Sequence, residues 1–180
     1  GMLDTAKRQL RRLLDGLRPA VEAGLPVVGL EPACVSAFRD ELPNLFPEDD
    51  TARKLAGGTL LFSEFLDLHC RDLALPRLDR KALVQIHCHH HAVIKDEAER
   101  RVMKRLGLDA DIMPTGCCGM AGSFGFERSH FEVSAKIAGL SLLPSLAAAP
   151  EATVAAPGTS CRHQIHDLAG RRALHPLELV

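Results

Sequence analysis

Leucine recurs every three to four positions from the N-terminus onward and predicts an amphipathic helix that ends at Gly24. Residues 26–30 form a short apolar run rich in valine, which predicts a buried strand. Glu31 and Pro32 then begin a second helix, with proline at the first helical position, where its missing N–H is tolerated. We expect this helix to end before Pro43.

Short apolar runs alternate with helical patterns along the rest of the chain. Residues 51–69 read as two helical stretches split near Gly57 and Gly58. The strands are predicted at 82–88, 110–114 and 153–156, with 173–180 as a candidate fifth. This alternation predicts an α/β fold with an open, mostly parallel sheet of about four or five strands and helices on both faces. No repeat or linker divides the chain, so we expect residues 1–180 to form a single domain.

Polar residues and proline mark the expected boundaries of the later helices. Asp96 with Glu99, and Ser129 with Glu132, have the spacing of a capping box. Pro144 should kink or restart the helix that the second pair begins.

Composition narrows the range of partners. The formal net charge is −1, and no dense run of lysine and arginine occurs, which argues against nucleic acid as a partner. No apolar run reaches the roughly 18 residues of a membrane span, and no signal peptide is evident. Gly1 before Met2 is typical of a residue left after removal of a purification tag. We expect a cytoplasmic protein that meets the inner face of the membrane only through partners.

Cysteines follow the predicted strands. In an open parallel sheet, the carboxyl ends of the strands border the crevice where ligands bind. Cys70 instead lies within a helical pattern and reads as a small buried hydrophobic residue. Five thiols are therefore expected at one edge of the sheet: Cys34, Cys88, Cys117, Cys118 and Cys161.

Converging thiols have few uses. A disulfide is disfavoured in a reducing compartment, and the paired C-x2-C spacing typical of zinc sites is missing. An iron–sulfur cluster needs thiolates and nearby backbone amides. The glycine-rich segment 116–125 suits that need, because Gly116 and Gly119 allow backbone N–H groups to approach an anionic ligand.

The positions of two cysteines and of a histidine run bear on thiol and metal chemistry. Cys34 and Cys161 fall in the first turns of helices, where the helix dipole should lower their pKa values. Such thiols suit a metal ligand and also a redox enzyme. In the run 87–91, His87 and His89 are candidate ligands or supporting residues of the metal, whereas the next two histidines are expected to be exposed.

These cysteine motifs resemble the CCG cysteine-rich domain, which occurs in heterodisulfide reductase and in the iron–sulfur subunits of glycolate oxidase and anaerobic glycerol-3-phosphate dehydrogenase. The chain is closer still to the C-terminal region of fusion proteins that join an FAD-linked oxidase, a ferredoxin-like segment and a CCG region. The resemblance covers roughly residues 26–180 and rests on the segments EPACVSAFRDELPNLFP, HCHHHA, GCCGMAGSFGFE and APGTSCRHQIHDLAGRRALHPLELV.

The resemblance implies a fragment or subunit of a larger flavin oxidase that acts on D-lactate, glycolate or D-2-hydroxyglutarate. A cluster of the 4Fe-4S type would transfer electrons, FAD would sit on a separate oxidase domain, and a ferredoxin-like domain would be a further partner. No dinucleotide fingerprint follows any predicted strand, so the fragment alone should not oxidise substrate.

One departure from the family pattern leaves the metal open. The family motif ends in C-x-x-C, whereas Gln164 stands three residues after Cys161. Because this spacing is nearly one helical turn, we expect residue 164 to face the same pocket. Cys34 could replace the missing thiolate, or the site could hold zinc with help from histidines. A thiol-redox enzyme is the remaining alternative.

Overall fold

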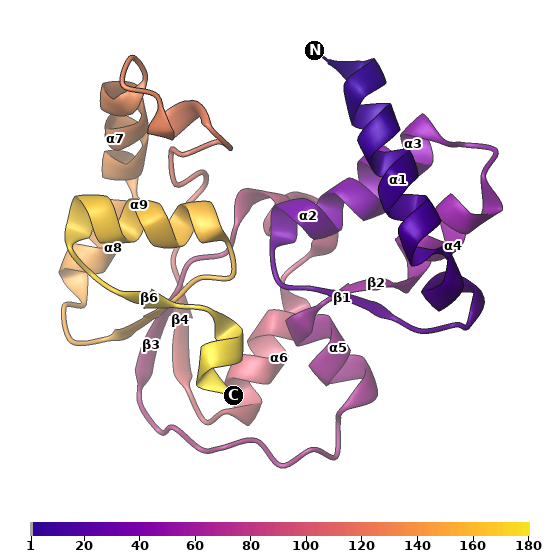
Figure 1. Cartoon of the computed structure of the whole chain (residues 1–180). Helices are drawn as coiled ribbons and strands as arrows, with labels where there is room; N and C mark the ends of the chain where they lie inside the picture. Colours follow the sequence, from indigo (N-terminus) through magenta and orange to yellow (C-terminus); the bar gives the residue numbers. More distant parts are fainter. Residues whose placement is uncertain (1) are drawn as a thin grey trace.

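A computed structural model describes residues 2–180, so the expected tag remnant Gly1 lies outside the described residues. The chain forms two groups of elements that meet near the middle of the molecule (Figure 1). One group surrounds the strands β3 to β6, and the other, built from the N-terminal third, surrounds β1 and β2.

The larger sheet has four parallel strands in the order β4-β3-β5-β6. They are β3 (Lys81–Val84), β4 (Asp109–Ile112), β5 (Thr153–Ala155) and β6 (Ala173–Leu174). This confirms the predicted α/β fold with a parallel sheet. The candidate fifth strand is a strand for two residues only, because Pro176 begins the 3-10 helix η4 (Pro176–Leu179).

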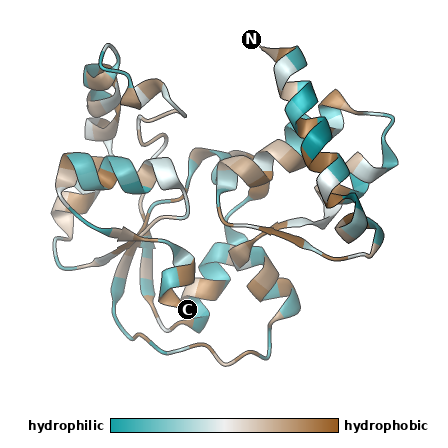
Figure 2. Ribbon diagram, viewed as in Figure 1, coloured by the Kyte–Doolittle hydropathy of each residue, from teal (hydrophilic) through white to brown (hydrophobic). Residues whose placement is uncertain are grey.

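Helices cover both faces of this sheet, as the run of apolar residues in its strands requires. On one face, Leu83 and Val154 pack against α7 (Phe131–Leu140), α8 (Leu142–Ala148) and α9 (Thr159–Ala169). On the other face, Val84 packs against α5 (Phe62–His69) and α6 (Glu97–Arg105). The alternation of apolar and polar residues along the helices is visible in Figure 2.

The smaller sheet corrects the sequence analysis. Strand β1 (Val27–Gly29) does not join the larger sheet but pairs in parallel with β2 (Thr59–Leu61). That partner lies inside a segment we predicted as helical. Around this sheet lie α1 (Leu3–Glu22), α2 (Pro32–Ser36), the π-helical turn η1 (Ala37–Glu41), α3 (Leu42–Leu45) and α4 (Asp50–Gly58).

Two expectations about the helix ends were wrong, and a third is confirmed. Pro43 does not end its helix, because the π-helical turn before it places proline in the first turn of α3. Neither capping box forms: α6 has no side-chain cap, and α7 begins after His130. Pro144 lies in the first turn of α8, beyond a 51° bend from α7, which confirms the predicted restart.

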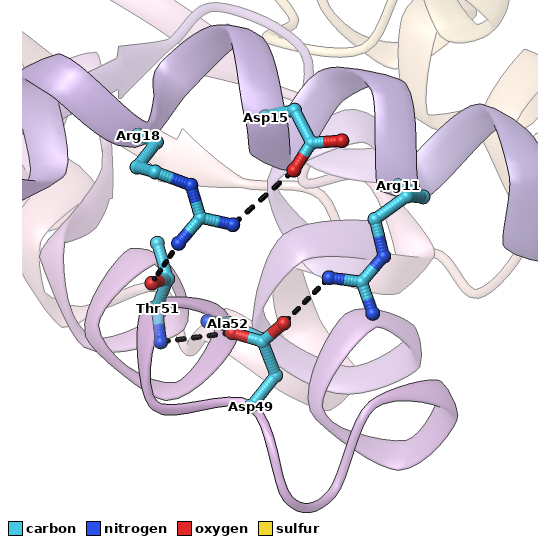
Figure 3. Close-up of polar contacts among 6 residues, drawn as sticks. All are labelled: Arg11, Asp15, Arg18, Asp49, Thr51 and Ala52. Atoms are coloured by element: carbon cyan, nitrogen blue, oxygen red, sulfur yellow. Dashed lines mark hydrogen bonds and ion pairs between the residues drawn. The ribbon is translucent and has the colours of Figure 1, made fainter.

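Helix α1 is fastened to the start of α4 by a polar network (Figure 3). Asp49 caps α4 by accepting hydrogen bonds from the amides of Thr51 and Ala52, and its carboxylate pairs with Arg11 at 2.6 Å. Arg18 donates to the Thr51 hydroxyl at 2.7 Å. The Arg11 hydrogen bond lowers the pKa of Asp49, so the cap stays ionised.

Two hydrogen bonds join the smaller sheet to the larger one at the end of β1. His175 Nε2 lies 2.8 Å from the carbonyl oxygen of Leu30. The next residue, Glu31, accepts from the Thr159 amide at 2.6 Å. Among residues 2–180 no single helix has the length and apolar composition of a membrane span, although the bent α7–α8 pair passes that test jointly.

Candidate metal centre

A cavity of about 670 Å³ opens beyond the carboxyl ends of β3, β4 and β5. Three of the predicted thiols line it, those of Cys88, Cys117 and Cys118. Cys161, 1% exposed, is hydrogen-bonded to Cys118. The other lining residues are Glu31, Ala33, His87, His89, Ala121, Gly122, Phe126, Thr159, Ser160 and His163.

Strand β3 delivers Cys88 between two histidines. The possible ligand atoms of His87, Cys88 and His89 all lie within 4.8 Å of one another, and the two imidazole rings are stacked at 5.3 Å. His87 Nδ1 accepts from the His89 amide at 3.2 Å. The proton of neutral His87 is therefore assigned to Nε2, which lies 3.4 Å from the Ser160 hydroxyl. Burial lowers the pKa of His87, which favours this neutral form.

The turn after β4 carries the adjacent cysteines. Gly119 adopts a φ of +98°, and a Cβ atom there would lie 2.3 Å from the Ser134 carbonyl oxygen. Only glycine fits this turn, which aims the Gly119 amide at the Cys117 sulfur, 3.3 Å away. Gly116 has open space around its Cα, so the structure imposes no such constraint at that position.

The thiols of Cys118 and Cys161 interact through a hydrogen bond. Hydrogen bonds from the Cys161 thiol, the Met120 amide and the Ser160 hydroxyl lower the pKa of Cys118 to about 6 against the effect of burial. The same hydrogen bond to Cys118, together with burial, raises the pKa of Cys161. Our expectation of a lowered pKa for Cys161 was therefore wrong, because its partner is the thiol that ionises first.

Cys34 differs from the other four predicted thiols. It is the third residue of α2 and is exposed, and its side chain does not line the cavity although its neighbour Ala33 does. Partial burial and the carboxylate of Glu31 raise the pKa of Cys34, which is the opposite of our expectation. Cys70 lies at the end of α5, half-buried against the core beside α6 and away from the cavity.

Gln164 faces the back of the cysteine turn and not the cavity. Its Nε2 donates to the Cys118 carbonyl at 2.9 Å and to the Ser134 hydroxyl at 2.9 Å, and the side chain is 3% exposed. Gln164 therefore ties α9 to the cysteine turn and to α7. This corrects the expectation that residue 164 faces the same pocket as Cys161.

The sequence carried only weak indications of several contacts at the site. Glu31 caps α2, accepting from the Ala33 amide at 3.4 Å, while its second oxygen binds the amide of Thr159 at the start of α9. Only the proline after Glu31 hinted at this capping role. His90, which we expected to be exposed, is fully buried, and both of its ring nitrogens lack a partner among the described residues.

A second cavity also involves two of these thiols. It measures about 620 Å³ and is lined by Cys88 and Cys117 together with His91, Asp96 and Arg100, among others. Cys88 and Cys117 thus line both cavities, whereas the side chains of Cys118 and Cys161 are buried.

Comparison with known proteins finds relatives that are much longer than this chain. The chain is 29% identical over 183 residues to D-2-hydroxyglutarate dehydrogenase from Pantoea ananatis and 30% identical over 182 residues to that from Pseudomonas putida. It is 26% identical over 184 residues to a subunit of anaerobic glycerol-3-phosphate dehydrogenase from Escherichia coli. All three alignments cover the whole chain but only 18%, 17% and 46% of the relatives. No family model matches the chain.

Proposed function

We propose that this chain is the metal-binding electron-transfer module of an FAD-linked 2-hydroxy-acid dehydrogenase, of the D-lactate, glycolate or D-2-hydroxyglutarate type. The observation that carries the proposal is that Cys88, Cys117 and Cys118 line one cavity, with Cys161 hydrogen-bonded to Cys118 beside it. Similarity to segments of much larger dehydrogenases supports it. FAD and a ferredoxin-like centre would belong to other domains of the same protein or complex.

The donor set fits an iron–sulfur cluster of the 4Fe-4S type. Thiolates are the ligands that such clusters require, and the amide of Gly119 already points at the Cys117 sulfur. Cys88, Cys117, Cys118 and Cys161 would hold the cluster, which would supply one-electron transfer when bound. Cys34 would need to turn toward the cavity to serve as a further ligand, and Gly116 would contribute only its backbone.

The protein's own residues prepare this site. The hydrogen bond from Cys161 lowers the pKa of Cys118, so Cys118 is the thiol of this pair that ionises first, and a bound metal would have to displace the proton that Cys161 keeps. The Ser160 hydroxyl lies 3.4 Å from His87 Nε2, which ties the first turn of α9 to the segment after β3. The rings of Phe126 and His163, both of which line the cavity, meet edge-on.

Metal analysis of protein purified without oxygen tests the proposal. Iron and acid-labile sulfide in equal amounts, with broad visible absorbance, are the expected result. Cys117→Ala should abolish metal loading, because loss of one thiolate exposes the cluster to hydrolysis. Cys70→Ala is the matched control and should load normally. Equal metal loss in both variants would show that the cysteines have been assigned wrongly.

Two specific observations favour rival functions. The clustered ligand atoms of His87, Cys88 and His89 suit a single zinc ion, for which the protein would be colourless with stoichiometric zinc. The lowered pKa of Cys118 beside Cys161 suits a thiol-redox enzyme. In that case the Cys118 thiolate would attack a substrate disulfide, and Cys161 would resolve the mixed disulfide, releasing the substrate as two thiols. Metal-free protein with one fast-reacting thiol would favour this rival.

A further inference from the structure

The smaller sheet has only two strands, and both run in parallel. Parallel strands are usually found inside larger sheets with covered edges, and an isolated pair of strands is only marginally stable in water. A two-stranded parallel sheet therefore leaves two edges whose backbone groups need partners.

The outer edge of β2 is already covered by side chains. Arg39 Nε donates to the Thr59 carbonyl oxygen at 2.9 Å, and the Leu61 amide donates to Glu64 Oε2 at 2.8 Å. Arg39 and Glu64 are themselves joined by two hydrogen bonds of 3.0 and 2.7 Å. This ion pair occupies two of the backbone groups that point away from β1, the Thr59 carbonyl and the Leu61 amide, and so hinders the pairing of a further strand at that edge.

The same contacts identify the backbone groups of β1 that remain open. Along a strand, the backbone N–H and C=O groups of successive residues point alternately to the two edges. Thr59 and Leu61 direct their N–H and C=O groups away from β1, so Leu60 directs its N–H and C=O toward β1. Val28 lies opposite Leu60 in the register. In a parallel pair, the backbone groups of Leu60 therefore bond to Val27 and Gly29, the two neighbours of Val28. The N–H and C=O of Val28 itself point to the outer edge of β1. No other strand pairs with β1 anywhere in the described part of the chain.

The surroundings of this edge are apolar and exposed. Leu25, Val28 and Leu30 are 59%, 37% and 48% exposed, although they belong to one of the most apolar runs of the sequence. A recess of about 510 Å³, lined largely by apolar side chains, opens at the start of the strand beside Leu25 and Leu60. Added strands use backbone hydrogen bonds for affinity and such recesses for side-chain specificity.

We propose that the outer edge of β1 pairs with an extended apolar strand from another part of the larger dehydrogenase to which this chain belongs. The relatives contain far more sequence than this chain matches, 54% of the glycerol-3-phosphate dehydrogenase relative and over 80% of the others. A strand tethered in the same protein acts at a high effective concentration. Pairing with a second copy about a two-fold axis would be antiparallel, whereas every strand pair in this chain is parallel.

Backbone hydrogen exchange of the chain alone provides the first test. We expect the Val28 amide to exchange at least about tenfold faster than the Gly29 amide, which is bonded to β2. Equal protection of both amides would overturn the proposal, because the edge would then already be occupied.

The second test uses peptides as probes. Overlapping peptides from the unmatched part of the Escherichia coli glycerol-3-phosphate dehydrogenase relative are added to the chain, and at least one should protect the Val28 amide. Val28→Pro removes the outward N–H but none of the bonds to β2, and it should weaken that binding at least about tenfold. Val28→Thr keeps the N–H and is the matched control.

Three further results would overturn the inference. They are failure of every peptide to protect Val28, equal binding by the proline and threonine variants, and a dimer of the chain that Val28→Pro abolishes. The dimer would assign the edge to a second copy. Metal content is measured in each variant, because the inference rests on the proposed membership of a larger dehydrogenase but not on the metal. If a variant no longer pairs with the added strand but still binds metal fully, the proposed metal centre is unaffected by the failure of this inference.

Discussion

Replacing Glu99 by glutamine probes a carboxyl group that lies in the core between α5 and α6. The side chain is 1% exposed, and its Oε1 has no hydrogen-bond partner among the described residues. Burial raises the pKa of Glu99 to about 7, and the charge of Asp96 adds to this effect, while the nearby Ser63 hydroxyl opposes it. Glu99 is therefore largely neutral in the folded protein below pH 7.

The sign and size of the pH effect follow from this shift. The folded state holds the proton more tightly than the unfolded chain, in which the pKa is about 4.5. Stability should therefore fall as the pH rises from 4.5 through 7 and should change little above that. At about 1.4 kcal/mol for each pKa unit, the loss between pH 5 and pH 8 is about 2 to 3 kcal/mol.

Urea denaturation at pH 5 and pH 8 measures this loss. Glu99→Gln should remove the pH-dependent loss, whereas Glu97→Gln, an exposed change in the same helix, should keep it. Histidines titrate in all three proteins, so their contribution cancels in the comparison. If wild type and Glu99→Gln lose the same stability between the two pH values, Glu99 is ionised in the fold and the reasoning is wrong.

Further variants test other parts of the structure. Gln164→Ala should lower the free energy of unfolding by about 2 to 4 kcal/mol, because the buried Cys118 carbonyl and Ser134 hydroxyl lose their hydrogen-bond donor. A loss of less than about 1 kcal/mol in urea denaturation would contradict this. Glu31→Ala should speed amide exchange in the first turn of α9, while Glu31→Gln should not, because glutamine keeps an acceptor. Cys70→Ala should cost only about 1 kcal/mol in thermal unfolding and leave metal content unchanged. His90→Leu should match or exceed wild-type stability, because it removes two buried nitrogens without partners; a loss above 2 kcal/mol would reveal a partner.

The sequence predicted the larger sheet and four of the thiols at its edge for one physical reason. Cys88, the adjacent Cys117 and Cys118, and Cys161 all follow strands of the same parallel sheet, so the rule that carboxyl ends share an edge applies to them directly. Cys34 follows β1, whose partner is β2. The apolar pattern of the sequence does not reveal which strands pair. The prediction that Cys34 lies at the same sheet edge as the other four thiols therefore had no physical basis.

The remaining differences arise from contacts that are distant in sequence. Strand β2 has three residues within a longer leucine-rich stretch, and only its pairing with β1 distinguishes it from a helix. The pKa of Cys161 depends on Cys118 more than on the dipole of its own helix. The role of Gln164 depends on Ser134, which lies 30 residues earlier.

The two hydrogen bonds at Leu30 and Glu31 also bear on the order of folding during synthesis. They span 145 and 128 residues, so the smaller sheet leaves the ribosome long before its partners at Thr159 and His175 exist. At about 5 to 20 residues per second this wait lasts roughly 6 to 30 s. During that time β1 is exposed at both its edge and its end, and an unpaired strand edge of this kind invites pairing with other chains.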